Sequence, residues 1–87
     1  MLTVIHTFNH PDQDRILSEI KSGLSTMDDV SGFKYASLNK QTNTNDFVVV
    51  SKWDNRAVFE DWTGTVGENN AFKQATPQIF DVLEERY

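Results

Sequence analysis

Segment 47–53, FVVVSKW, constrains the fold of this chain more than any other part. Its β-branched and aromatic residues favour a strand, and consecutive side chains of a strand point to opposite faces. Apolar residues fall on both faces here: Phe47, Val49 and Trp53 on one, Val48 and Val50 on the other. Both faces are therefore expected to leave water, and the fold has to cover both sides of the sheet.

Two elements are predicted before this segment. Residues 2–8 form a short β-branched strand in which His6 shares a face with Val4 and Phe8. An amphipathic helix follows, because apolar side chains recur at helical spacing: Ile16, Leu17, Ile20, Leu24 and Met27. His6 is therefore expected to point into the core with its two apolar neighbours.

A hairpin supplies a neighbour for the apolar segment. Residues 33–42 alternate with the period of a strand, with Phe33 and Tyr35 on one face and Ala36 on the other. The polar cluster 41–46 makes the turn that leads into segment 47–53.

Two short helices and an ambiguous tail complete the chain. A helix that begins after Asp54 or Asn55 places Phe59 and Trp62 on one face. A further short turn of helix around residues 70–75 ends before Pro77. Segment 78–87 fits a helix or a strand by its periodicity. A strand is favoured, because a fourth strand completes a split β-α-β-β-α-β sheet.

The predicted fold class is thus α+β, with a ferredoxin-like antiparallel sheet in a single domain over residues 1–87. Eight basic against thirteen acidic residues give a net charge of −5, which repels phosphate backbones and anionic lipid. We therefore expect neither a nucleic acid nor a membrane as partner. The chain has no cysteine, and its start resembles neither a secretion signal nor a membrane span, so a cytoplasmic location is expected.

The second face of the sheet predicts a partner. In a split β-α-β-β-α-β fold the helices cover one face, and the other would leave Val48 and Val50 in water. Burial of apolar surface contributes about 25 cal/mol per Å². We therefore expect a homodimer with the two sheets face to face, and a ligand cavity between each sheet and its helices or at the subunit boundary.

The order of these elements resembles a known family. The strand beginning SGFKYASL, the segment FVVVSKWDNRAVFEDW and the later NNAFKQA are similar to the antibiotic biosynthesis monooxygenases, a family of small dimeric α+β barrels. The most specific part runs from Phe47 through Trp62 to Phe72. The resemblance implies a cofactor-independent monooxygenase acting on a phenolic or quinol substrate, although the family also contains haem-degrading enzymes and proteins without established activity.

One sequence position argues against membership of the haem-degrading branch of the family. Trp62 matches the family's haem-site tryptophan, and His6 lies at or near its asparagine. Thr76 stands where the iron-ligating histidine would be, and loss of that imidazole removes the proximal iron bond. His6 or His10 could ligate iron only from another direction. We therefore expect no metal and no cofactor.

His6 is the candidate catalytic residue, because it is the only ionisable ring predicted to face inward. An imidazole can take a proton from a phenol or hydroquinone, and the resulting anion can pass an electron to dioxygen. The alternative is a packed histidine bonded to a backbone carbonyl or a hydroxyl. His10, beside a helix start, is interpreted as a surface or capping residue.

Four residues are candidates for substrate binding. Trp62 and Phe72 would form the walls of an aromatic site, with the Trp62 N–H orienting an oxygen, and Tyr35 or Thr76 would bond a substrate hydroxyl. Each can equally be an ordinary core or surface residue. Two functions therefore remain open: an oxygenase with a small planar aromatic substrate, and a non-catalytic module that binds a small apolar metabolite.

Overall fold

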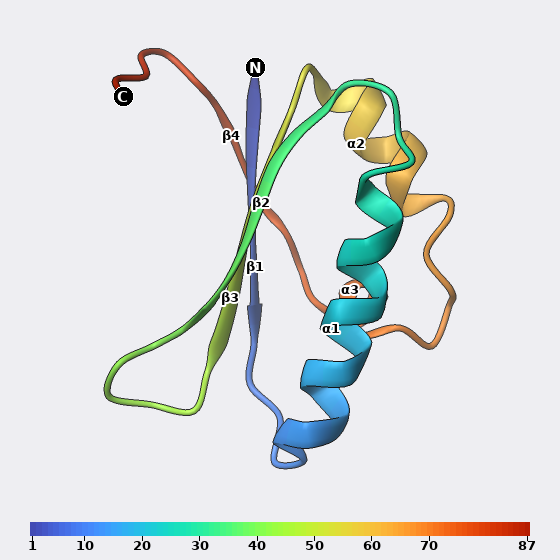
Figure 1. Cartoon of the computed structure of the whole chain (residues 1–87), viewed down its shortest axis with the longest axis vertical. Coiled ribbons are helices and arrows are strands. Elements are labelled where there is room, and N and C mark those ends of the chain that lie inside the picture. Colours follow the sequence, from blue (N-terminus) through green and yellow to red (C-terminus); the bar gives the residue numbers. More distant parts are fainter.

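A four-stranded antiparallel sheet with three helices on one side forms the structure, a computed structural model that describes all of residues 1–87 (Figure 1). The elements in chain order are β1 (Leu2–Phe8), α1 (Gln13–Met27), β2 (Phe33–Lys40), β3 (Phe47–Trp53), α2 (Arg56–Thr63), α3 (Ala71–Gln74) and β4 (Gln78–Asp81). The strand order is β2-β3-β1-β4. This is the ferredoxin-like arrangement, and the predicted α+β fold class is confirmed.

The apolar strand β3 lies inside the sheet, as its sequence requires. It pairs with β1 from Leu2 opposite Trp53 to Phe8 opposite Phe47, and with β2 on its other side. Alternate residues of β1 and β3 face the helices and are buried: Leu2, Val4, His6 and Phe8, with Phe47, Val49, Ser51 and Trp53. The core therefore lies between these two strands and the helices.

Helix α1 covers that core with the predicted face. Ile16, Ile20 and Met27 are buried, and Leu17 and Leu24 pack at the edge of the core. The helix begins after Asp12, whose carboxylate accepts a hydrogen bond of 3.1 Å from the Arg15 N–H, as an N-cap does. None of the three helices has the length and apolar character needed to cross a membrane.

A bulge in β2 corrects one part of the sequence prediction. Phe33 and Tyr35 were predicted on one face, but Phe33 lies opposite Trp53 and Tyr35 lies opposite Lys52, so that Lys34 is the extra residue. A bulge shifts every later side chain to the other face. Phe33 therefore joins the core, and Tyr35 points away from the helices with about half of its surface exposed.

The tail confirms the preference for a strand, although the strand is short. β4 pairs with β1 over only four residues, and one further hydrogen bond joins the Val82 N–H to the Met1 carbonyl at 3.0 Å. The chain then leaves the sheet on the side opposite the helices (Figure 1). The prediction of a strand over the whole of 78–87 was therefore wrong beyond Asp81.

No element of this chain covers the second face of the sheet (Figure 1). Ile5, Val48 and Val50 are half-buried there, and Phe80 is about half exposed. An open hollow of about 1110 Å³ lies on this face between β2, β3 and the tail. The homodimer expected on this surface remains a prediction.

Candidate functional site

His6 lies inside a cluster of aromatic rings, because the alternation of β1 directs it toward the helices. Only 2% of its surface is exposed. Its ring centroid lies 4.9 Å from that of Phe72, 6.1 Å from those of Phe8 and Phe59, and 6.3 Å from that of Trp62. We call these five residues the aromatic cage. It is assembled from β1, α2 and α3, and the predicted inward direction of His6 is confirmed.

The His6 Nδ1 atom is buried and has no hydrogen-bond partner. A buried polar atom without a partner costs about 1–3 kcal/mol, and such atoms are rare in folded proteins. A structural histidine, the alternative interpretation from sequence, should have bonded Nδ1 to a carbonyl or hydroxyl. The structure offers Nδ1 no such group within the chain.

Burial also sets the charge of the ring. Removal from water disfavours the charged imidazolium and lowers the pKa of His6 to about 4. The ring is therefore neutral at pH 7, and one of its nitrogens carries a lone pair that can accept a proton.

Trp62 forms a wall of the cage but does not offer the predicted hydrogen bond. Its Nε1–H donates to the Thr26 Oγ1 at 2.9 Å, and the Thr26 hydroxyl donates to the Gly23 carbonyl at 2.6 Å. Because an indole has a single N–H donor, no donor remains for a substrate oxygen. The expected orienting role of this N–H was therefore wrong, and Trp62 supplies a flat apolar surface whose edge meets His6.

Phe72 sits against the backbone of α1 at Gly23. A Cβ atom at Gly23 would lie 2.5 Å from the Phe72 ring, so only glycine leaves room for it. Sequence reasoning missed Gly23, although a glycine inside an amphipathic helix is a known signal of close packing. It also missed Phe8 and Phe59 as members of the cage.

Tyr35 and Thr76 lie away from the cage. Tyr35 is on the opposite face of the sheet from His6, and Thr76 is exposed in the segment between α3 and β4. The structure thus brings together His6, Trp62 and Phe72 and separates the two predicted hydroxyl partners from them. The bulge in β2 accounts for the position of Tyr35, because a bulge leaves no sign in the periodicity of the strand.

The space between sheet and helices is filled by the chain's own rings. None of the main surface hollows is lined by His6 or Trp62. One hollow, of about 210 Å³, reaches the neighbouring Phe8 at the end of β1, between α1 and α3. Access to His6 therefore requires a side chain to move.

A profile of the antibiotic biosynthesis monooxygenases matches residues 1–77. The chain belongs to this family. The cofactor-independent oxygenase SnoaB of Streptomyces nogalater superposes on it with a TM-score of 0.80 and 15% identity, over 97% of this chain and 94% of SnoaB. A haem-degrading protein of Mycobacterium tuberculosis superposes with a TM-score of 0.74 and 15% identity, over 99% and 98% of the two chains. At these identities the likeness shows the fold alone. No protein of curated function matches the sequence.

The residues of this family member do not suit a haem. The rings of the cage pack closely against His6, and none of the main surface hollows reaches it. Thr76 offers an exposed hydroxyl where the resemblance places an iron ligand.

Proposed function

We propose that this protein is a cofactor-independent monooxygenase in which His6 takes a proton from a small phenolic or quinol substrate. One observation carries the proposal: a buried imidazole, neutral at pH 7 and with Nδ1 unpaired, stands among aromatic rings in a member of an oxygenase family. Perturbed, unpaired titratable groups in apolar surroundings are typical of catalytic positions.

The reaction needs no reductant other than the substrate. The phenolic O–H loses its proton to His6, and the electron-rich anion passes an electron to dioxygen. One oxygen atom then enters the substrate, and the other leaves as water with the two hydrogens that the substrate gives up. The four electrons that reduce dioxygen come from the substrate ring, in which one C–H carbon gains the oxygen atom and a hydroxyl-bearing carbon is oxidised to a carbonyl.

The low pKa of His6 ties this proton transfer to bound substrate. In the cage without a ligand, burial holds the pKa at about 4, so the imidazolium is unstable there. A phenolate in contact with the ring stabilises the imidazolium, because opposite charges attract strongly where water is excluded. The base therefore holds a proton only while the anion is beside it.

The cage would hold a planar substrate by its apolar faces. Trp62 and Phe72 supply those faces, and His6 is the polar group among them. We do not assign substrate contacts within one subunit to Tyr35 or Thr76, because both lie outside the cage.

We also propose a homodimer through the bare face of the sheet. Ile5, Val48 and Val50 form its apolar centre, and Tyr35 and Phe80 are half exposed around them. Covering this face removes apolar surface from water in both copies. Sedimentation at micromolar concentration should give about twice the 10.0 kDa mass of the chain. A folded monomer would contradict the dimer.

Oxygen uptake with a panel of hydroquinones tests the function. His6→Ala should lower the rate by about 10²- to 10⁴-fold, the usual contribution of a general base. His10→Ala is the matched control, because His10 lies at the protein surface and its Nδ1 accepts a hydrogen bond from the Asp12 N–H. Equal turnover by the parent and His6→Ala would remove His6 from the mechanism.

Non-catalytic binding of a small apolar metabolite is the second candidate. It is favoured by the closed cage and by the engaged N–H of Trp62, which leave few polar groups to direct a reaction. Measurable binding of a hydroquinone without oxygen uptake above background would support it over the oxygenase.

A further inference from the structure

The Phe72 ring occupies a position whose walls all come from other elements. It meets the rings of His6, Phe8 and Trp62 edge-on, at centroid distances of 4.9, 5.1 and 5.1 Å. These partners belong to β1 and α2, and the Gly23 backbone of α1 closes a further side. The walls would therefore remain if the ring left. We call this position the ring seat.

The element that carries Phe72 is the shortest helix of the fold. α3 has four residues, whereas α1 has fifteen. The segment before α3 is mostly exposed and contains Gly64 and Gly67. Short, exposed segments open locally at low free energy compared with core strands and long helices. Of the rings in the cage, Phe72 is thus the one carried by the shortest element, outside the sheet and next to an exposed segment.

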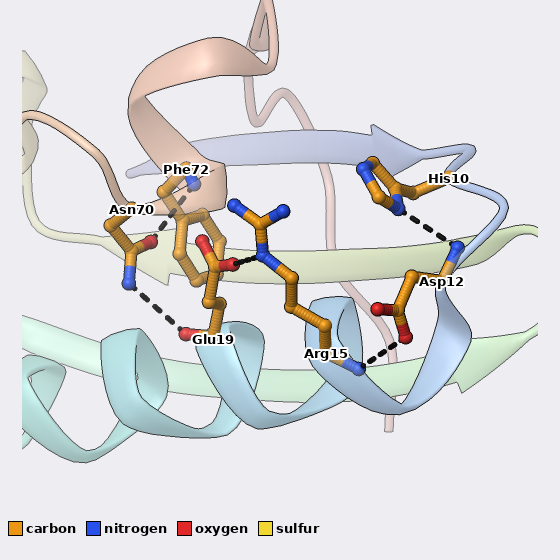
Figure 2. Close-up of polar contacts among 6 residues, drawn as sticks. All are labelled: His10, Asp12, Arg15, Glu19, Asn70 and Phe72. Atoms are coloured by element: carbon orange, nitrogen blue, oxygen red, sulfur yellow. Dashed lines mark hydrogen bonds and ion pairs between the residues drawn. The ribbon is translucent and has the colours of Figure 1, made fainter.

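One side chain makes the polar connection between α3 and α1. The Asn70 Oδ1 accepts a hydrogen bond of 2.9 Å from the Phe72 N–H, and its Nδ2 donates to the Glu19 carbonyl at 3.1 Å (Figure 2). The Glu19 carboxylate is in turn paired with Arg15 (Figure 2). Release of the Asn70–Glu19 bond would remove this polar link between α3 and α1 while the cap of α3 stays intact, and the packing of Phe72 against Gly23 would remain.

A surface hollow lies beside the ring seat. Its volume is about 210 Å³, and its walls include Phe8, Ile16 and Ala71. Phe8 belongs both to this hollow and to the seat, and Ala71 precedes Phe72 in α3. A drug-sized ligand needs a pocket of about 300 Å³ or more, whereas an apolar cavity of about 150 Å³ holds a benzene ring. The space suits one aromatic ring.

We propose that a monocyclic phenol or hydroquinone enters through this hollow and replaces the Phe72 ring in the ring seat, while Phe72 moves outward with α3. The ligand ring takes over the edge contacts with Phe8 and Trp62 and lies against His6. This inference rests on the proposed function for its substrate class, and it limits that class to single rings. In the absence of a ligand the Phe72 ring occupies the site, and the substrate must displace this ring.

Calorimetric titration with phenol tests the displacement. Parent protein binds only from its ring-out state, and a minor state populated at about 0.1–10% weakens apparent affinity by that fraction. Phe72→Ala should therefore bind phenol at least about tenfold more tightly than the parent. Phe72→Leu, which keeps more of the core, should show a smaller gain and serves if the alanine variant does not fold.

Phe59→Ala is the matched control, because it deletes the same side chain from a wall of the cage rather than from the ring seat. A gain with Phe59→Ala equal to that with Phe72→Ala would show a nonspecific cavity and overturn the proposal. Unchanged affinity in folded Phe72→Ala or Phe72→Leu would also overturn it. In Phe72→Ala, phenol should bind more tightly than 1-naphthol, and equal affinity would remove the single-ring limit.

A second substitution locates the ligand. Adding Gly23→Ala to Phe72→Ala places a Cβ where the ring edge had been, and should weaken phenol binding by about tenfold or more. Gly64→Ala is the control, because its Cβ would make only an ordinary contact of 3.4 Å. No effect of Gly23→Ala would place the ligand elsewhere and overturn the proposal.

Binding and turnover separate this proposal from the function on which it rests. If Phe72→Ala gains affinity but no hydroquinone is oxidised, the ring seat stands and the oxygenase fails. If oxidation depends on His6 but Phe72→Ala gains no affinity, the oxygenase stands and the ring seat fails.

Discussion

The two faces of the sheet are made by alternate residues of the same strands, yet this chain covers one face with helices and leaves the other largely uncovered. On the helix side Val4, Val49 and Trp53 are fully buried. On the other side their neighbours in β3, Val48 and Val50, are only half-buried. The difference shows that apolar alternation predicts that a face should be covered, whereas the elements available within the chain decide whether it is.

The two faces also differ in whether their polar groups find partners. On the helix side the Trp53 N–H donates to the Ser51 hydroxyl, and His6 Nδ1 is the exception that stays unpaired. On the bare side Lys52 and Glu85 form an ion pair, and their mutual hydrogen bond raises the pKa of Lys52 and lowers that of Glu85. The unpaired group lies in the secluded layer, where an unmet hydrogen bond costs most.

The largest expected effect is the difference in stability lost when a side chain is truncated on the helix side and on the bare face. Trp53→Ala should lower the free energy of unfolding by about 3–5 kcal/mol, because it empties a fully buried volume. Val48→Ala on the bare face removes a half-buried side chain and should cost less in urea unfolding at low protein concentration. Equal losses would mean that the bare face is as well packed as the core.

Acid should weaken the helix side through His6. The unfolded pKa is near 6.5 and the folded pKa about 4, so below pH 6.5 the unfolded chain gains a proton that the folded chain does not. The free energy of unfolding should therefore fall as the pH drops from 6.5 to 4, by up to about 3 kcal/mol. His6→Leu lacks this component, and urea unfolding of both proteins across this range measures the difference. Parallel curves would contradict the buried, neutral ring.

Gly23→Ala in the parent should lower stability by about 1–3 kcal/mol, because the new Cβ overlaps the Phe72 ring. The better helix propensity of alanine offsets about 1 kcal/mol of this loss. Thermal unfolding of Gly23→Ala and Gly64→Ala makes the comparison. A Gly23→Ala protein more stable than the parent would show that the ring moves aside at little cost.

The smallest effect belongs to the bare face. Lys52→Ala should change stability less than any of the substitutions above at low protein concentration, because the Lys52–Glu85 pair is partly solvated. The change should shrink further in 1 M salt, which screens exposed charges. A large loss at low protein concentration, where the monomer prevails, would contradict a solvated pair.

Much of the fold could be predicted because its signals are local. Strands 2–8 and 47–53 have the predicted bounds, since β-branched runs between polar turns mark both ends. The bulge at Lys34 could not be predicted, because the strand is periodic on either side of it. The end of β4 depends on how far β1 extends beside it, which the tail's own sequence does not encode.

The amino-acid sequence by itself determined the order of the elements and the inward direction of His6, because alternation along a strand acts between neighbouring residues. Only the tertiary structure decided that Thr26 takes the Trp62 N–H and that Phe72 fills the space beside Gly23. Those contacts join residues 36 and 49 positions apart, which only the packing of α1 against α2 and α3 brings together.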